Sequence, residues 1–227
     1  MKLHTLLLTT VMTMTGFGAL AADNNQLAKG GTYVGLAAGW GAIPQVQDVF
    51  SWIFGAAPNS TQSGGFSSRV YLGYLMSLSA DNSWLFGPEL GYSSYANNSY
   101  TATELFGSPS TISIKQSAYG ADLLLNARYL LSNRLNIAVK PGFQYAFEKN
   151  TIDFPGVDYY RSASDTRVLP EINVEASWQA FQNTPFFLGA SYQYVWGDTE
   201  DYTNFKYNNA ETTSREMIAL NLEYLFA

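Results

Sequence analysis

The fold is decided by a stretch near the C-terminus that reads Ile218-Ala219-Leu220-Asn221-Leu222-Glu223-Tyr224-Leu225-Phe226. From Ile218 to Phe226 every second residue is large and apolar or aromatic, whereas Asn221 and Glu223 occupy the positions between them. Successive side chains of a β-strand point to opposite faces of the sheet. The stretch therefore predicts a strand with one apolar face and one polar face.

The same alternation recurs in seven earlier segments, at residues 32–41, 66–76, 84–95, 112–131, 135–145, 167–178 and 186–196. Strands that are apolar on one face only have an average hydropathy near zero, which agrees with the mean hydropathy of −0.08. Together with the quoted stretch, the segments predict an all-β fold, an eight-stranded antiparallel up-and-down transmembrane β-barrel.

The predicted connections alternate between short and long. Residues 77–83, 132–134 and 180–185 form short turns rich in Ser, Asn and Asp, whereas residues 42–65, 96–111, 148–165 and 198–212 form long polar loops. Short periplasmic turns and longer extracellular loops are typical of outer-membrane barrels. We therefore expect both termini on the periplasmic side.

Composition also indicates a lipid-facing surface. Charged residues make up 13% of the chain, against about a quarter in soluble domains. Tryptophan favours membrane interfaces. Trp84 and Trp178 lie at the short-turn ends of their segments and Trp40 and Trp196 at the long-loop ends, which predicts two aromatic belts. The alternative is that these tryptophans pack in the core of a soluble sandwich.

The N-terminus predicts export. Lys2, a short apolar stretch from Leu6 to Met14 and the small residues around Ala19 to Ala21 are typical of a cleaved signal peptide over residues 1–21. The alternative, a membrane-spanning helix, is disfavoured because the apolar stretch is shorter than the roughly 20 residues that a span needs. The barrel domain is then 22–227, located in the outer membrane of a Gram-negative bacterium.

Three prolines conflict with the strand pattern, because Pro88, Pro141 and Pro170 fall inside predicted strands. Proline cannot donate a ladder hydrogen bond and is usually confined to edges or bulges. We expect local bulges or an unpaired carbonyl at these points.

Four short motifs carry a resemblance to a known family: Tyr33-Val34-Gly35-Leu36, Val70-Tyr71-Leu72-Gly73-Tyr74, Pro88-Glu89-Leu90-Gly91-Tyr92 and Asn221-Leu222-Glu223-Tyr224-Leu225-Phe226. Together they resemble the outer-membrane β-barrel superfamily that includes the OmpA transmembrane domain and the opacity-type surface proteins. The resemblance implies that Tyr224 and Phe226 form the signal read by the barrel-assembly machinery, although Ala227 follows the final phenylalanine. It does not extend to a peptidoglycan-binding domain.

The predicted mature chain has neither histidine nor cysteine, because His4 lies in the signal peptide. This excludes Ser-His and Cys-His nucleophilic pairs and imidazole or thiolate metal sites. We expect no enzymatic activity, no cofactor and no metal. The formal net charge of −6 argues against nucleic acid as a partner.

Charged residues on the polar parity predict a network inside the barrel. Its members are Arg69, Glu89, Asp122, Arg128, Lys140, Arg167, Glu171 and Glu175. Paired carboxylates can serve as acid or base, but buried charges must be paired in any case, which favours a structural network. An eight-stranded interior is just wide enough for side chains to fill, so we expect no conduction.

The long loops hold the remaining candidates. Phe50-Ser51-Trp52-Ile53-Phe54 either packs against the barrel or binds a partner, and the two readings are equally favoured. The acidic groups Asp198, Glu200 and Asp201, and Asp153 with Asp158, match no ordered calcium-binding spacing, so solvated loops are favoured.

We expect a non-enzymatic, monomeric surface barrel with a structural role and with adhesion or host contact through four loops. Its expected partners are outer-membrane lipid or lipopolysaccharide, the assembly machinery, and a host or surface ligand. The alternatives are a narrow porin or receptor for a small apolar ligand, and a secreted soluble barrel of lipocalin type with its apolar parity inside.

Overall fold

The structure, a computed structural model, describes residues 30–43, 60–62, 64–78, 83–102, 112–132, 134–154, 159–181, 184–197 and 213–226. The predicted signal peptide, the Phe50–Phe54 stretch, Asp158 and the acidic group of Asp198, Glu200 and Asp201 lie outside these ranges. No helix in the described part of the chain is long and apolar enough to cross a membrane.

Ten strands are present in the described residues. They are β1 (Gly31–Ala42), β2 (Ser60–Gln62), β3 (Gly65–Ser77), β4 (Trp84–Ser94), β5 (Asn98–Ala102), β6 (Ile112–Leu130), β7 (Leu135–Phe154), β8 (Tyr159–Gln179), β9 (Phe186–Val195) and β10 (Arg215–Phe226).

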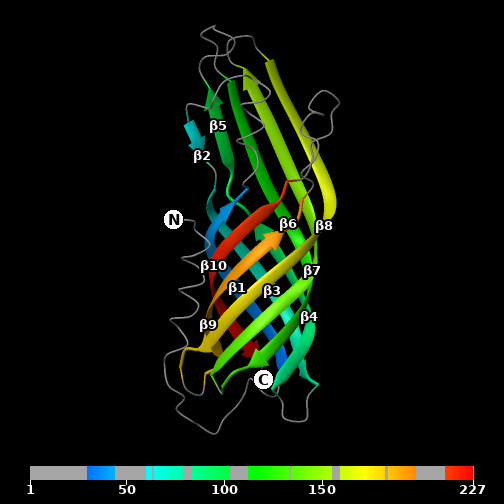
Figure 1. Ribbon diagram of the computed structural model, residues 1–227, viewed down its shortest axis with the longest axis vertical. Helices are drawn as coiled ribbons and strands as arrows, with labels where there is room; N and C mark the ends of the chain where they lie inside the picture. Colours follow the sequence, from blue (N-terminus) through cyan, green and yellow to red (C-terminus); the bar gives the residue numbers. More distant parts are fainter. Residues whose placement is uncertain are drawn as a thin grey trace.

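Eight of the strands close into a barrel. The sheet runs β6-β4-β3-β1-β10-β9-β8-β7, and β7 pairs back with β6, with every pair antiparallel. In Figure 1 the strands are inclined to the long axis of the molecule, as closure of a barrel requires. The predicted eight-stranded antiparallel barrel is confirmed.

The apolar parity faces outward. Leu36, Leu72 and Leu220 are 59%, 55% and 72% exposed, whereas their strand neighbours on the other parity are buried or close to it. Tyr71 and Asn221, for example, point into the lumen and are 2% and 4% exposed. A lipocalin-type barrel needs the opposite arrangement, so that alternative is wrong.

Strand length divides the barrel into two sides. β1, β4, β9 and β10 have 12, 11, 10 and 12 residues, close to the 9–11 that cross a bilayer at a tilt. β6, β7 and β8 have 19, 20 and 21 residues. Because the excess is at the long-loop end, these strands continue past the barrel wall, as Figure 1 shows at its top.

We call this extension the projecting sheet. It comprises β2, β5 and residues 112–118, 147–154 and 159–169 of β6, β7 and β8. The predicted loop 148–165 is therefore largely a continuous hairpin, and the predicted loops 42–65 and 96–111 contain β2 and β5.

The three prolines lie at gaps in the ladder. Pairs Gly73–Glu89 and Met76–Phe86 of β3 and β4 keep the same register on either side of the gap at Pro88. Pairs Leu124–Gly142 and Ala127–Val139 do the same around Pro141. No residue is inserted at either point, so of the two expected outcomes, a bulge or an unpaired carbonyl, the bulge is wrong there.

Pro170 lies where the β8–β9 ladder ends. The first pair of that ladder is Glu171–Val195, and the Pro170 carbonyl accepts a hydrogen bond from the Trp196 amide at 3.0 Å. Beyond this proline, β8 pairs only with β7 among the described strands.

Candidate functional site

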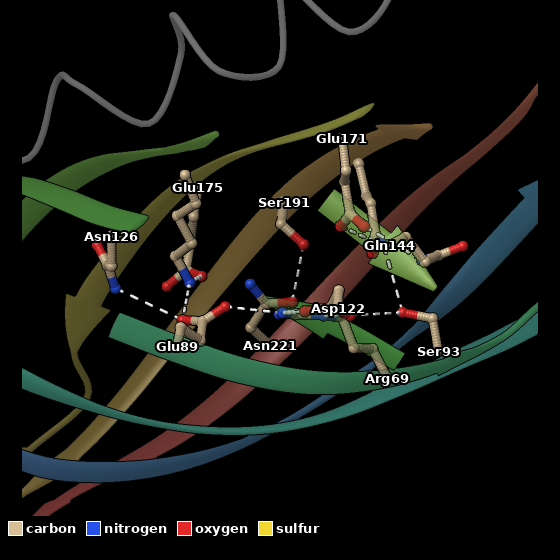
Figure 2. Close-up of polar contacts among 12 residues, drawn as sticks. Arg69, Glu89, Ser93, Asp122, Asn126, Gln144, Glu171, Glu175, Ser191 and Asn221 are labelled. Carbon is tan, nitrogen blue, oxygen red and sulfur yellow. Dashed lines mark hydrogen bonds and ion pairs between the residues drawn. The ribbon is translucent and has the colours of Figure 1, made fainter. Parts of the chain in front are cut away.

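The lumen contains seven of the eight residues predicted for a polar network. Each is at most 3% exposed: Arg69, Glu89, Asp122, Arg128, Lys140, Glu171 and Glu175. They come from β3, β4, β6, β7 and β8, and alternation along each strand turns them inward. Figure 2 shows most of this set converging from opposite walls of the barrel.

Glu89 is at the centre of the network. One carboxylate oxygen pairs with Arg69 at 2.8 Å, and the other pairs with Lys140 at 2.8 Å. The Tyr33 hydroxyl donates to the second oxygen at 2.7 Å. Lys140 also pairs with Glu175 at 2.8 Å, so one ammonium group bridges two carboxylates.

A second cluster lies one level closer to the long-loop end. Arg69 holds Asp122 through two nitrogens. Glu171 has no ion pair in the described part of the chain and instead accepts from two amides, Gln144 at 3.2 Å and Gln193 at 2.7 Å. Both amides also donate to the Tyr95 hydroxyl.

An ion pair occupies each end of the lumen. Near the short turns, Arg128 forms a two-pronged pair with Glu223, at 2.7 and 2.9 Å. Near the long loops, a nitrogen of Arg215 lies 3.6 Å from Glu148. Apolar side chains close the short-turn end further: Leu75, Leu85, Phe187 and Leu225.

Arg167 is not part of the network. Its side chain is 36% exposed and pairs with Asp165, also on β8, at 2.8 Å. Arg167 has the inward parity, but it belongs to the projecting sheet, beyond the level at which β9 completes the wall. The prediction that Arg167 lies in the lumen was wrong. The inward orientation of a residue on its strand does not indicate how far along the barrel axis the residue lies.

Several network members were not among the predicted site residues. Glu223 and Arg215 share the inward parity of Asn221 on β10, and this signal identifies both. Tyr33 was missed because a tyrosine on a strand gives no indication that its hydroxyl will meet a carboxylate. Glu148 was missed because it fell in a predicted loop.

The outer surface has aromatic side chains at both ends. Trp84 and Trp178 are exposed at the short-turn end, and Trp40 and Trp196 at the long-loop end. Trp84 contacts Tyr129 at a ring-centroid distance of 4.8 Å. At the predicted assembly signal, Tyr224 contacts Phe226 at 4.6 Å.

A second row of rings follows the long-loop end of β4, β6 and β7. Tyr92, Tyr119, Phe147 and Tyr145 follow one another with centroid distances of 6.3, 5.1 and 4.8 Å. We call these four residues the upper aromatic row. Because tyrosine is enriched at membrane interfaces, we expect this row to lie near the outer interface on this side of the barrel.

Most charges in the lumen are paired with an opposite charge, whereas Glu171 is held by two amides. In the residues that the structure describes, no group of three or more His, Cys, Asp or Glu side chains is placed to hold a metal ion. Glu89, Lys140 and Arg128 are completely buried, and each charge is met by an opposite charge. The Arg128–Glu223 pair connects β6 and β10, which lie on opposite sides of the barrel.

Solved structures resembling the chain are outer-membrane barrels of low sequence identity. One is Ail, the attachment invasion locus protein of Yersinia pestis, in complex with the heparin analogue sucrose octasulfate, with 11% identity, a TM-score of 0.47, and coverage of 86% of this chain and 99% of that one. Neisserial surface protein A has 16% identity, a TM-score of 0.46, and coverage of 86% and 97%. The outer membrane protease OmpT of Escherichia coli has 9% identity, a TM-score of 0.45, and coverage of 89% and 100%.

No curated protein matches the sequence. The family model of the OmpA-like transmembrane domain, in contrast, matches residues 28–227, which include every described strand. With its closed eight-stranded wall and outward apolar parity, the chain belongs to the family of OmpA-like transmembrane domains and is an outer-membrane β-barrel.

Proposed function

We propose that this protein is a non-enzymatic surface barrel that supports the outer membrane and contacts other surfaces through its projecting sheet and long loops. The observation that carries the proposal is the length of β6, β7 and β8, which exceeds what a bilayer crossing needs by about a factor of two. A hairpin that continues past the membrane interface presents ordered backbone and polar side chains to the exterior.

The composition of that extension supports a contact role. Its outward positions hold Lys115 and Lys149 and, on β8, the hydroxyl residues Ser162, Ser164 and Thr166, all of them exposed. Such side chains give a polar surface suited to reversible contact. The lumen supports the structural component, because most of its charges form ion pairs and some of these, such as Arg128–Glu223, connect facing walls.

The test is truncation of the β7–β8 hairpin. Residues 150–163 are replaced by Asn-Gly, a two-residue sequence that favours a tight hairpin turn. Cells displaying the intact protein are expected to bind host cells or matrix-coated surfaces, and the truncated protein is expected to lose this binding. Folding is checked in both by heat-modifiable migration in gels.

The matched control shortens the sequence 198–212 and leaves β7 and β8 intact. Retained binding in this control, with loss in the truncated hairpin, supports contact through the projecting sheet. If cells with the intact protein bind no better than cells without it, or if removing all four predicted loops in turn changes nothing, the adhesive part of the proposal is wrong.

A further inference from the structure

The lipid-facing side of the barrel has almost no charge. Among the outward positions of the described strands only four residues are charged: Lys115, Lys149, Asp153 and Glu216. Glu216, on β10, accepts a hydrogen bond from Tyr192 at 2.8 Å. The two lysines are on the adjacent strands β6 and β7, so positive charge is concentrated on one side of the molecule.

The height of these lysines is set by the upper aromatic row. Lys149 is two residues beyond Phe147 on β7, and Lys115 is four residues beyond Tyr119 on β6, both toward the long-loop end. At about 3.3 Å per residue on an inclined strand, they lie roughly 5 and 10 Å above the rings. Lipid headgroups occupy roughly 5–8 Å on each side of the hydrocarbon core. The backbone of Lys149 is therefore at headgroup height, and that of Lys115 is just above it, where its long side chain can reach down to the headgroups.

The residues directly opposite both lysines in the ladders carry hydroxyls. Ser117 pairs with Lys149 in the β6–β7 ladder and Thr151 pairs with Lys115, so the lysines are diagonal neighbours. On β8, Ser164 is opposite Lys149. Neither lysine has an ion pair in the part of the chain that the structure describes.

Two acidic residues lie near this patch. Glu148 has the inward parity and is 1% exposed, and its carboxylate accepts from Gln116, Asn150 and Thr213. Asp153 pairs with Ser113 and is a diagonal neighbour of Lys115 on the side away from the membrane, but it is not a neighbour of Lys149. Neither acid forms an ion pair with the lysines in the described part of the chain, so both lysines can bind an external anion.

We propose that Lys115 and Lys149, with the hydroxyls of Thr151 and Ser164, bind the phosphate groups of a phosphorylated glycolipid of the outer leaflet, that is, lipopolysaccharide. Lysine is a common phosphate ligand, and hydroxyls donate to the remaining phosphate oxygens. A lipid fits better than a soluble anion because Phe147 and Tyr119 lie directly below and contact the apolar part of the same molecule. This site depends only on where the membrane crosses the barrel and not on the adhesive function proposed above.

The test is lipid binding by the folded full barrel in phosphatidylcholine nanodiscs, titrated with lipopolysaccharide. The double variant Lys115→Ser/Lys149→Ser is expected to bind about 30-fold more weakly, because each lysine near an anionic membrane surface contributes about one kilocalorie per mole. The variant Lys115→Arg/Lys149→Arg is expected to bind like the parent. Asp153→Ser, a charge removal on the same sheet, is the matched control and should not weaken binding.

Two further arms identify the ligand. The first arm uses enzymatically dephosphorylated lipopolysaccharide. Its affinity for the parent protein is expected to be as low as the affinity of intact lipopolysaccharide for the double serine variant. In the second arm, inorganic phosphate is expected neither to bind the parent nor to compete with lipopolysaccharide. Equal affinity of the parent and the double serine variant would overturn the proposal, as would binding of inorganic phosphate that displaces the lipid. Circular dichroism and gel migration establish that all variants are folded.

Discussion

At the scale of single residues, Glu89 shows how a charge is kept inside the barrel. It accepts from Tyr33 and pairs with both Arg69 and Lys140, and it has no solvent-exposed surface. Glu89→Ala removes a carboxylate that pairs with both Arg69 and Lys140, so these two buried cations each lose an ion-pair partner. We expect a loss of about 3–5 kcal/mol in the free energy of unfolding, measured by urea titration of the protein in lipid vesicles.

The control for this prediction is an acid outside the lumen. Asp153 is exposed on the outward face of β7, so Asp153→Ala should change stability by no more than about 0.5 kcal/mol. If the two alanine variants unfold at the same urea concentration, the lumen network does not contribute to stability as its geometry implies.

The alternation of apolar and polar residues in the sequence correctly predicted most of this network. Seven of the eight predicted charges are in the lumen because an inward position between two membrane interfaces has nowhere else to point. Arg167 is the exception, since its strand continues past the wall. Predicting Arg167 correctly requires the position of each residue along the barrel axis. The alternation of apolar and polar residues does not give this position.

At the scale of elements, β1 and β3 are joined by two reciprocal tyrosine–glycine pairs. Tyr33 is paired with Gly73 and Tyr71 with Gly35 in the ladder, and each tyrosine ring lies over the glycine opposite. A Cβ on Gly73 would be 2.4 Å from Tyr33, and one on Gly35 would be 2.2 Å from Tyr71. The sequence signature is Tyr-x-Gly in both strands.

These pairs predict a non-additive effect. Gly73→Ala should destabilise the barrel by about 1–3 kcal/mol, because the added methyl group displaces the Tyr33 ring. In a Tyr33→Ala background the same glycine change should cost at least about 1 kcal/mol less, since the ring is gone. A double-mutant cycle by urea unfolding measures the coupling, and strict additivity would show that ring and glycine do not interact.

Strand boundaries were predictable only where lipid lies against the protein. Inside the bilayer the outward side chain must be apolar, so the alternation is strong. Past the interface both faces are polar, and a stretch such as Lys149-Asn150-Thr151 loses its period although it stays in β7. This is why residues 148–165 were expected to be a loop.

How the strands accommodate the three prolines was also difficult to predict from the sequence. A closed barrel has no edge, so a bulge or an unpaired carbonyl was expected at each proline. The structure instead keeps the register and interrupts the ladder next to a glycine: a Cβ on Gly87 would be 1.6 Å from the Tyr74 carbonyl oxygen, and one on Gly142 would be 2.1 Å from that of Leu123. Only a residue without a side chain allows this approach of the strands.

At the scale of the whole molecule, the lumen is a series of filled levels. From the short-turn end these are the Arg128–Glu223 pair, the Glu89–Lys140–Glu175 group, the Arg69–Asp122 pair with the amides around Glu171, and the Arg215–Glu148 pair. Arg128, Lys140 and Arg215 each have no solvent-exposed surface. Water therefore has no access to these three cations in the structure.

A filled lumen predicts the absence of ion conduction. The purified barrel in a planar bilayer should give no steady single-channel steps, whereas a porin added afterwards to the same membrane should give them and so demonstrate that the bilayer reports conduction. The informative variant is Glu89→Gln, which keeps the size of the side chain while removing its charge from the central level. The contrary result is steady steps in the parent whose conductance or ion selectivity changes in Glu89→Gln. Such steps would show that ions pass through the barrel. The narrow-porin alternative would then replace the structural interpretation of the lumen.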